Sequence, residues 1–185
     1  RKVRMEFTPS YIMDRAARYR IKKHLQPDTK FVVVLRDPVY RAYSHYWHAI
    51  NNWTEDSDWV TTRGYPVEKL KFRQAIELEL ERMVFDPYHR RHLSYFSKGL
   101  YYAQLNRWFS LFDRDQFHIL LFEELVTDTA RVLSGLANFL GIELPDFTFP
   151  RMNAQSGRTL DQPTYDWLSE RYTADTASLG ELLNI

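Results

Sequence analysis

The feature that most constrains the fold is the stretch from Lys30 to His48, KFVVVLRDPVYRAYSHYWH, which predicts a strand, a tight turn and a helix. Phe31 to Leu35 is a continuous apolar run rich in β-branched residues, typical of a strand covered on both faces in a parallel sheet flanked by helices. Asp37 suits a helix N-cap, and Pro38 suits the first helical position because proline has no N–H to leave unpaired there. A helix is therefore expected to begin at Pro38.

Beyond Pro38 the side chains sort by helical spacing. A polar and basic stripe follows the i, i+3, i+4, i+7 pattern and comprises Arg41, Ser44, His45 and His48. The other side is apolar, with Val39, Tyr43, Trp47 and Ile50, flanked by Ala42 and Tyr46. A strand ending in an arginine, Arg36, followed by such a helix, is how open α/β folds bind phosphate or sulfate. The alternative is a routine helix start, with Arg41 solvated and Ser44 bonded back to its own helix.

The remaining pattern fits one α/β domain with a mostly parallel sheet flanked by helices. Further strands are predicted at about 1–7 and 117–122. Helices are predicted at about 9–25, 68–83, 100–112, 128–140 and 164–182, with Gly141 closing the fourth of these. Residues 51–67 and 143–163 are expected to be loops.

Composition narrows the function classes. The chain has 185 residues, 44% of them hydrophobic and none of them cysteine, which excludes disulfides and thiolate catalysis. No apolar run approaches the length of a membrane span, about 18 residues. Residues 1–50 hold eleven Lys/Arg against four Asp/Glu, so the first part of the chain is expected to face an anion. Nucleic acid is not the expected partner, because basic and aromatic residues do not alternate and no nucleic-acid module is present.

The segment LRDPVYRAYSHYWH resembles the 3′-phosphate-binding strand and helix of sulfotransferases that use 3′-phosphoadenosine-5′-phosphosulfate (PAPS), particularly the glycosaminoglycan N- and O-sulfotransferase branch. The resemblance implies that Arg36 and Ser44 hold the 3′-phosphate of the donor. It also implies that His48, at the histidine of a Tyr-Ser-x-Tyr-x-His pattern, acts on the acceptor side. A solvated histidine on an amphipathic helix is the alternative for His48.

A second resemblance concerns Glu6, which the residues alone leave as either a structural partner for an arginine or a general base. The segment MEFTPSYI is similar to the Glu-Lys-(Ser/Thr)-x-x-Tyr-Phe segment of the same branch, in which the glutamate is the catalytic base. Glu6, Thr8 and Tyr11 match that segment, while Phe7 stands where the family has a lysine. The resemblance therefore implies that Glu6 is the base.

Later segments of the chain also resemble motifs of this family, and they follow one another in the family's order. Gly99, Tyr101 and Trp108 resemble the family's Gly-x-Tyr helix with its tryptophan, and Glu124-Leu125 resembles the end of the next strand. Ser156-Gly157-Arg158 is similar to the glycine-basic loop, usually Lys-Gly-Arg, that folds over the nucleotide. The resemblance implies donor contacts from Gly157 and Arg158, and a surface loop is the alternative.

The resemblance implies a P-loop-like, three-layer α/β fold. We expect residues 1–185 to form a single domain of this fold that lacks the first strand and the loop that cradles the 5′-phosphosulfate. The resemblance also implies in-line sulfuryl transfer from PAPS to a small-molecule or glycan acceptor, with no metal and no membrane span. Animal members of the family work in the Golgi lumen and commonly carry a disulfide, so the absence of cysteine favours a bacterial-type cytoplasmic protein or a domain cut from a larger one. Two alternatives stay open: a phosphoryl-transfer kinase of similar fold, which would need a Gly-rich Lys-Ser/Thr loop, and a donor-binding remnant without activity.

Overall fold

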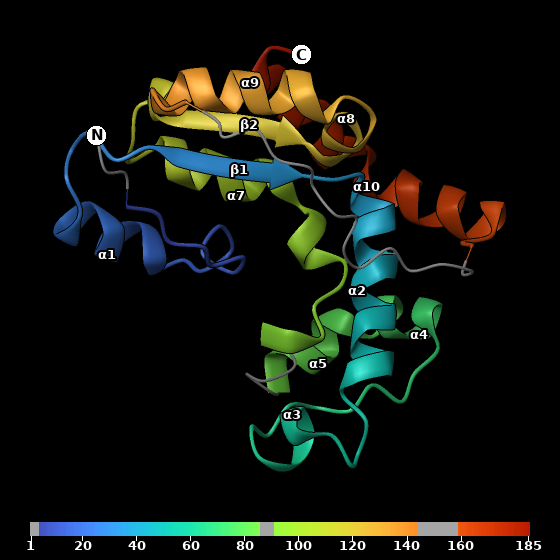
Figure 1. The fold of residues 1–185 in the computed structure, drawn as a ribbon. Coiled ribbons are helices and arrows are strands. Elements are labelled where there is room, and N and C mark those ends of the chain that lie inside the picture. Colours follow the sequence, from blue (N-terminus) through green and yellow to red (C-terminus); the bar gives the residue numbers. More distant parts are fainter. Residues whose placement is uncertain (1–3, 86–90, 144–158) are drawn as a thin grey trace. The chain divides into compact units, whose positions relative to one another are not determined.

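The structure, a computed structural model, describes residues 4–85, 91–143 and 159–185 (Figure 1). The chain divides into two compact units. The first consists of Arg1–Arg36, Tyr101–Ala154 and Leu179–Ile185, and the second of Asp37–Leu100 and Gln155–Ser178. The expectation of a single domain that lacks its first strand stays a prediction.

The first unit is built on two parallel strands. β1 (Phe31–Leu35) pairs with β2 (Phe117–Leu121), and the register runs from Phe31 opposite Phe117 to Leu35 opposite Leu121. Figure 1 shows α7 (Tyr101–Phe109) and α9 (Thr129–Leu140) on opposite sides of this pair, with the short α8 (Phe122–Thr127) directly after β2. Helices around a parallel sheet make the fold α/β, as predicted. The predicted strand at 31–35 is confirmed residue for residue.

The core of the first unit is aromatic. Phe31 lies within 5.5 Å of the ring centroids of Trp108, Phe112 and Phe117. The indole N–H of Trp108 donates to the backbone oxygen of Ile12 at 3.0 Å, which ties the N-terminal segment to α7. On the other side of β1, Val32 and Val34 are 39% and 50% exposed. Among the described residues only one face of this strand is packed, so the expected cover on both faces is not found there.

Two N-terminal expectations are wrong. Residues 4–8 form no strand, because the carboxylate of Glu6 accepts hydrogen bonds from Thr8 and Tyr11 and the chain turns locally instead of extending. Nor does a helix begin at Thr8-Pro9. α1 (Ala17–His24) starts later, where the carboxylate of Asp14 accepts from the amides of Ala16 and Ala17 at 2.7 and 3.2 Å.

The second unit packs around α2 (Pro38–Asn52), whose buried stripe is Val39, Ala42, Tyr46 and Ala49. The other elements are α3 (Asp58–Thr61), α4 (Phe72–Glu77), α5 (Glu79–Phe85), the 3₁₀ turn η1 (Ser97–Gly99) and α10 (Gln162–Leu183). The last turns of α10 belong to the first unit. The predicted apolar side of α2 is thus rotated, and Tyr43, Trp47 and Ile50 are only partly buried at its margin.

The helix predicted over 68–83 is divided between α4 and α5 at Leu78. At the break, the buried carboxylate of Glu79 accepts the backbone amides of Phe96 and Ser97 at 2.6 and 2.8 Å. Leu80, which the helical spacing of Leu70, Ile76, Leu80 and Met83 predicts to be buried, is 68% exposed. A polar residue with two backbone partners has taken the core-facing position.

Glu68 is a second buried carboxylate of this unit. Arg82 donates to both of its oxygens at 3.0 and 3.1 Å, and the hydroxyl of Tyr95 donates at 3.0 Å. The amide of Leu70 supplies a fourth hydrogen bond at 2.9 Å. Burial first, and then the Glu68 charge, raise the pKa of Tyr95. The buried charge of Glu68 is thus fully paired. Removing Arg82 or Tyr95 would leave a buried polar group without its partner, which would destabilise the fold.

Gly99 packs directly against the ring of Tyr172 in the second unit. A Cβ placed on Gly99 would lie 2.7 Å from the hydroxyl of Tyr172, which is 1% exposed. The Tyr172 ring stacks on Phe96 at 4.6 Å, and its hydroxyl donates to the Phe96 backbone oxygen at 2.9 Å. The ring is held in place and has little room to move aside.

We expect Gly99→Ala to lower the free energy of unfolding by about 1–3 kcal/mol, because an overpacked site must displace the Tyr172 ring. Urea denaturation measures this value. Gly135→Ala is the control, since its Cβ would lie 3.9 Å from His118, an ordinary contact. In a Tyr172→Leu background the cost of Gly99→Ala should shrink. An equal cost in both backgrounds would contradict the packing explanation.

Candidate active site

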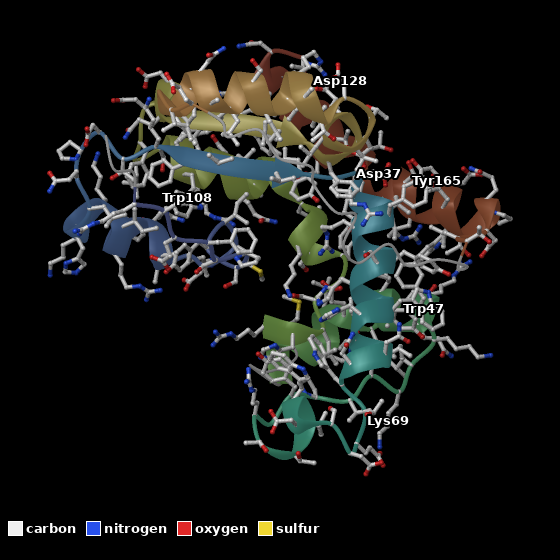
Figure 2. All side chains as sticks on the ribbon, viewed as in Figure 1. Asp37, Trp47, Lys69, Trp108, Asp128 and Tyr165 are labelled. Carbon is white, nitrogen blue, oxygen red and sulfur yellow. The ribbon has the colours of Figure 1, made fainter. Side chains whose placement is uncertain are left out.

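The start of α2 is fixed by the carboxylate of Asp37. One oxygen accepts the Tyr40 amide at 2.9 Å, the N-cap bond that the sequence predicts. The other accepts the hydroxyl of Tyr165, from the first turn of α10, at 2.9 Å. Figure 2 shows Asp37 and Tyr165 side by side. Burial, followed by the hydrogen bond to Asp37, raises the pKa of Tyr165 to about 12.

A second tyrosine ties α2 to the chain that leads into α10. The hydroxyl of Tyr43 donates to the backbone oxygen of Thr159 at 3.3 Å. The predicted donor contacts Gly157 and Arg158 come immediately before Thr159, and they lie outside the described residues. Their roles stay predictions.

The predicted polar stripe of α2 divides into packed and accessible members. Arg41 is not solvated, because its guanidinium donates to the backbone oxygen of Tyr95. The ring of His45 packs edge-on to Tyr95, with centroids 4.9 Å apart. Ser44 is half-buried, and its hydroxyl has no hydrogen-bond partner within the described ranges. His48 is exposed. Ser44 and His48 are therefore the stripe members open to a ligand, and the back-bonded alternative for Ser44 is not observed.

Two members of the stripe, Arg41 and His45, belong to a basic cluster that also contains His92 and Lys98. Burial, with the charges of Lys98, Arg41 and His48, holds the pKa of His45 well below its usual range. Burial, with the Lys98 and Arg91 charges, lowers the pKa of His92 to about 4. Burial and the Arg41 charge lower the pKa of Lys98 to about 7, against the opposing effect of Glu79. The Lys98 ammonium donates a hydrogen bond to the Arg91 backbone oxygen at 2.8 Å.

These shifts predict loss of stability in acid. Because both histidine pKa values are lowered, the unfolded chain binds protons below about pH 6.5 that the folded chain does not. Stability should therefore fall as the pH drops from about 6.5 towards 4. His45→Gln should reduce that pH-dependent fall, whatever it does to stability at pH 7. Urea midpoints at several pH values measure the slope, with the exposed His24→Gln as control. A slope unchanged by His45→Gln would contradict the assignment.

Arg36 follows β1 directly and lies in the first unit. Its guanidinium stands over the ring of Phe122, 4.7 Å from the centroid. Among the described residues no carboxylate lies within ion-pairing distance of it. The aromatic ring therefore holds the group in place without neutralising its charge, which is the state a phosphate-binding arginine requires.

Glu6 also lies in the first unit, on the irregular segment before α1. One oxygen of its carboxylate accepts the Tyr11 hydroxyl at 2.5 Å and the Thr8 hydroxyl at 3.2 Å. The hydrogen bond to Glu6 raises the pKa of Tyr11. In the part of the chain that the structure covers, the second oxygen has no partner. Glu6 thus has one oxygen held and one available for a proton.

The profile of the sulfotransferase domain family matches residues 17–175. The chain belongs to this family. The match includes Arg36, Ser44 and His48, and begins after Glu6.

Individual sulfotransferases agree with that assignment. Human heparan sulfate glucosamine 3-O-sulfotransferase 6 is 32% identical over 142 residues, covering 76% of this chain and 36% of the human protein. Membrane-associated sulfotransferase kil1 of Dictyostelium discoideum is 24% identical, covering 97% of this chain and 51% of that protein. A crystal structure of a sulfotransferase from Alicyclobacillus acidocaldarius superposes with a TM-score of 0.70 at 27% identity, covering 95% of this chain and 62% of that one. The chain thus spans about a third to a half of these curated relatives.

The described residues of this sulfotransferase domain contain neither a metal-binding cluster nor a membrane-spanning helix. The described ranges contain no group of three or more His, Asp or Glu side chains arranged to hold a metal ion. No helix of residues 4–85, 91–143 or 159–185 has the length and apolar character to cross a membrane.

Of the expected site residues of this sulfotransferase domain, Glu6 and Arg36 lie in the first unit and Ser44 and His48 in the second. Sequence reasoning missed Tyr43 and Tyr165, because their partners lie more than 110 residues away along the chain. It also missed Asn52, which hydrogen-bonds to His48. The i, i+4 spacing of Asn52 and His48 was a signal that could have found it.

Proposed function

We propose that this domain transfers a sulfuryl group from PAPS to a hydroxyl or amine of a small-molecule or glycan acceptor. The observation that carries the proposal is the segment from β1 through Arg36 to α2, which forms as the resemblance requires and lies inside the family match. The proposal includes a P-loop-like, three-layer fold with a central sheet between helices, no metal requirement and a bacterial-type cytoplasmic location. Nucleic acid is not among the proposed partners.

The donor residues follow from the resemblance and from each local environment. Arg36 binds the 3′-phosphate with a guanidinium that Phe122 holds and that no described carboxylate neutralises. Ser44 donates its unused hydroxyl to the same phosphate. Gly157 and Arg158 contact the nucleotide from the segment before Thr159.

The reaction is an in-line displacement at sulfur. The acceptor oxygen or nitrogen forms a bond to sulfur while the bond from sulfur to the bridging phosphate oxygen breaks, leaving 3′-phosphoadenosine 5′-phosphate. Glu6 takes the proton that the acceptor loses. His48 stabilises charge at the transferring group, and positioning together with electrostatics supplies most of the rate.

Arg36→Ala should weaken binding of 3′-phosphoadenosine 5′-phosphate by about 1.5–3 kcal/mol, as for a lost charged hydrogen bond, and Ser44→Ala by less. Isothermal titration calorimetry measures both. Adenosine 5′-phosphate, which lacks the 3′ group, is the control ligand and should lose little. Equal losses for the two nucleotides would count against the assignment.

On the acceptor side, Glu6→Gln should abolish most turnover, and His48→Ala should lower kcat about 10- to 1000-fold, with donor affinity nearly unchanged in both. The measurement is single-turnover sulfuryl transfer, after a screen of sugars, hydroxy-acyl chains and phenols for an acceptor. His24→Ala is a matched control, since that exposed histidine ends α1. Tight donor binding without transfer to any acceptor would favour the inactive alternative.

A further inference from the structure

Asn52, the last residue of α2, lies one helical turn beyond His48. Its amide nitrogen Nδ2 is 2.8 Å from the His48 backbone oxygen and 3.3 Å from Nδ1 of the His48 ring. A carbonyl oxygen can only accept a hydrogen bond, so the group beside it must be the NH₂ of the amide and not its oxygen. The second hydrogen of that NH₂ then faces Nδ1.

We propose that Asn52 holds neutral His48 in the tautomer that carries its proton on Nε2. Nδ1 can accept from Asn52 only with a free lone pair, which places the proton on the other nitrogen. The opposite tautomer would set N–H against N–H. Turning the amide over would relieve that clash only by setting its oxygen against the His48 carbonyl oxygen. Either change loses hydrogen bonds that the observed arrangement makes.

The ring is also held in orientation. It stands edge-on to the indole of Trp53, with centroids 5.8 Å apart and planes at 88°. Trp53 is itself buried and packs against Tyr65 at 5.2 Å. With Nδ1 turned to Asn52, Nε2 is the ring nitrogen of this exposed side chain that is left for a ligand.

The inference rests on the proposed function for its chemical meaning. A neutral His48 with Nε2–H cannot take the acceptor's proton at that nitrogen, so the base role stays with Glu6. His48 instead donates a hydrogen bond to an oxygen of the transferring group, where negative charge grows. Asn52 is then a positioning residue, acting through His48.

The direct test is the tautomer itself. Long-range ¹H–¹⁵N correlation spectra of the histidine-labelled full chain, at about pH 8.5 where an imidazole is neutral, distinguish a protonated from an unprotonated ring nitrogen. His48→Gln identifies the signals. We expect Nδ1 unprotonated and Nε2 protonated. A proton on Nδ1 in the native protein overturns the inference whether or not the domain transfers sulfuryl groups.

Two matched variants test the part played by Asn52. Asn52→Asp and Asn52→Ala both remove the donor to the backbone, but only aspartate supplies an acceptor beside Nδ1. Asn52→Asp should therefore move the proton to Nδ1, and Asn52→Ala should leave a mixture like that of a solvated imidazole. If Asn52 served only to stabilise the end of the helix, both variants would lower the melting temperature and neither would change the tautomer.

Kinetics at the same pH separate this inference from the proposed function. Asn52→Asp should lower single-turnover transfer by about 10-fold or more, and Asn52→Ala by no more than about threefold, with donor affinity unchanged in both. A tautomer that moves in Asn52→Asp without loss of rate overturns the donor role of His48 and leaves sulfuryl transfer standing. Absence of transfer in the native protein overturns the proposed function, while the spectra still decide the tautomer.

Discussion

The carboxylate of Asp37 sets the register of the helix on which half of the candidate site depends. A helix that begins one residue earlier or later turns every side chain by about 100°. Asp37 prevents such a slip by capping the Tyr40 amide with one oxygen, and its other oxygen binds the hydroxyl of Tyr165. Ser44 and His48 remain accessible, and Val39 and Ala42 remain buried, because this start is fixed from both sides.

Sequence patterns predicted those parts of the fold that local chemistry decides. The apolar run of β1, the cap at Asp37 and the left-handed glycine at Gly141, with φ of 68°, each combine a strong local preference with one available structure. The predicted strand over 1–7 had no such support, because a strand needs a partner, whereas the Glu6 side chain binds Thr8 and Tyr11 in a local turn. Glu79 shows the other limit. Its buried carboxylate is paired with two backbone amides that lie seventeen and eighteen residues later in the chain. The spacing of apolar residues along the sequence gives no sign of these hydrogen bonds.

The candidate site divides in the same way. Ser44 and His48 could be assigned to one face of α2 from their spacing, because helix geometry relates them, and Arg36 could be assigned to the end of β1 from the apolar run before it. The contacts that hold these side chains in place could not be predicted from the sequence. Only the folded chain shows these contacts, because the sequence does not indicate which residues will meet. They are Phe122 with Arg36, Trp53 with His48, and Tyr165 with Asp37. The packing of Arg41 and His45 against Tyr95 likewise made half of the predicted polar stripe part of the core.

The contact between Gly99 and Tyr172 has a consequence for how sulfotransferase domains diverge. The space that a side chain at position 99 would need is filled by a phenol ring whose hydroxyl is bound to the Phe96 backbone. Neither position can change freely while the other stays as it is. Across related sequences the two should therefore covary, with a larger residue at 99 accompanied by a shorter one at 172, although 73 residues separate them along the chain.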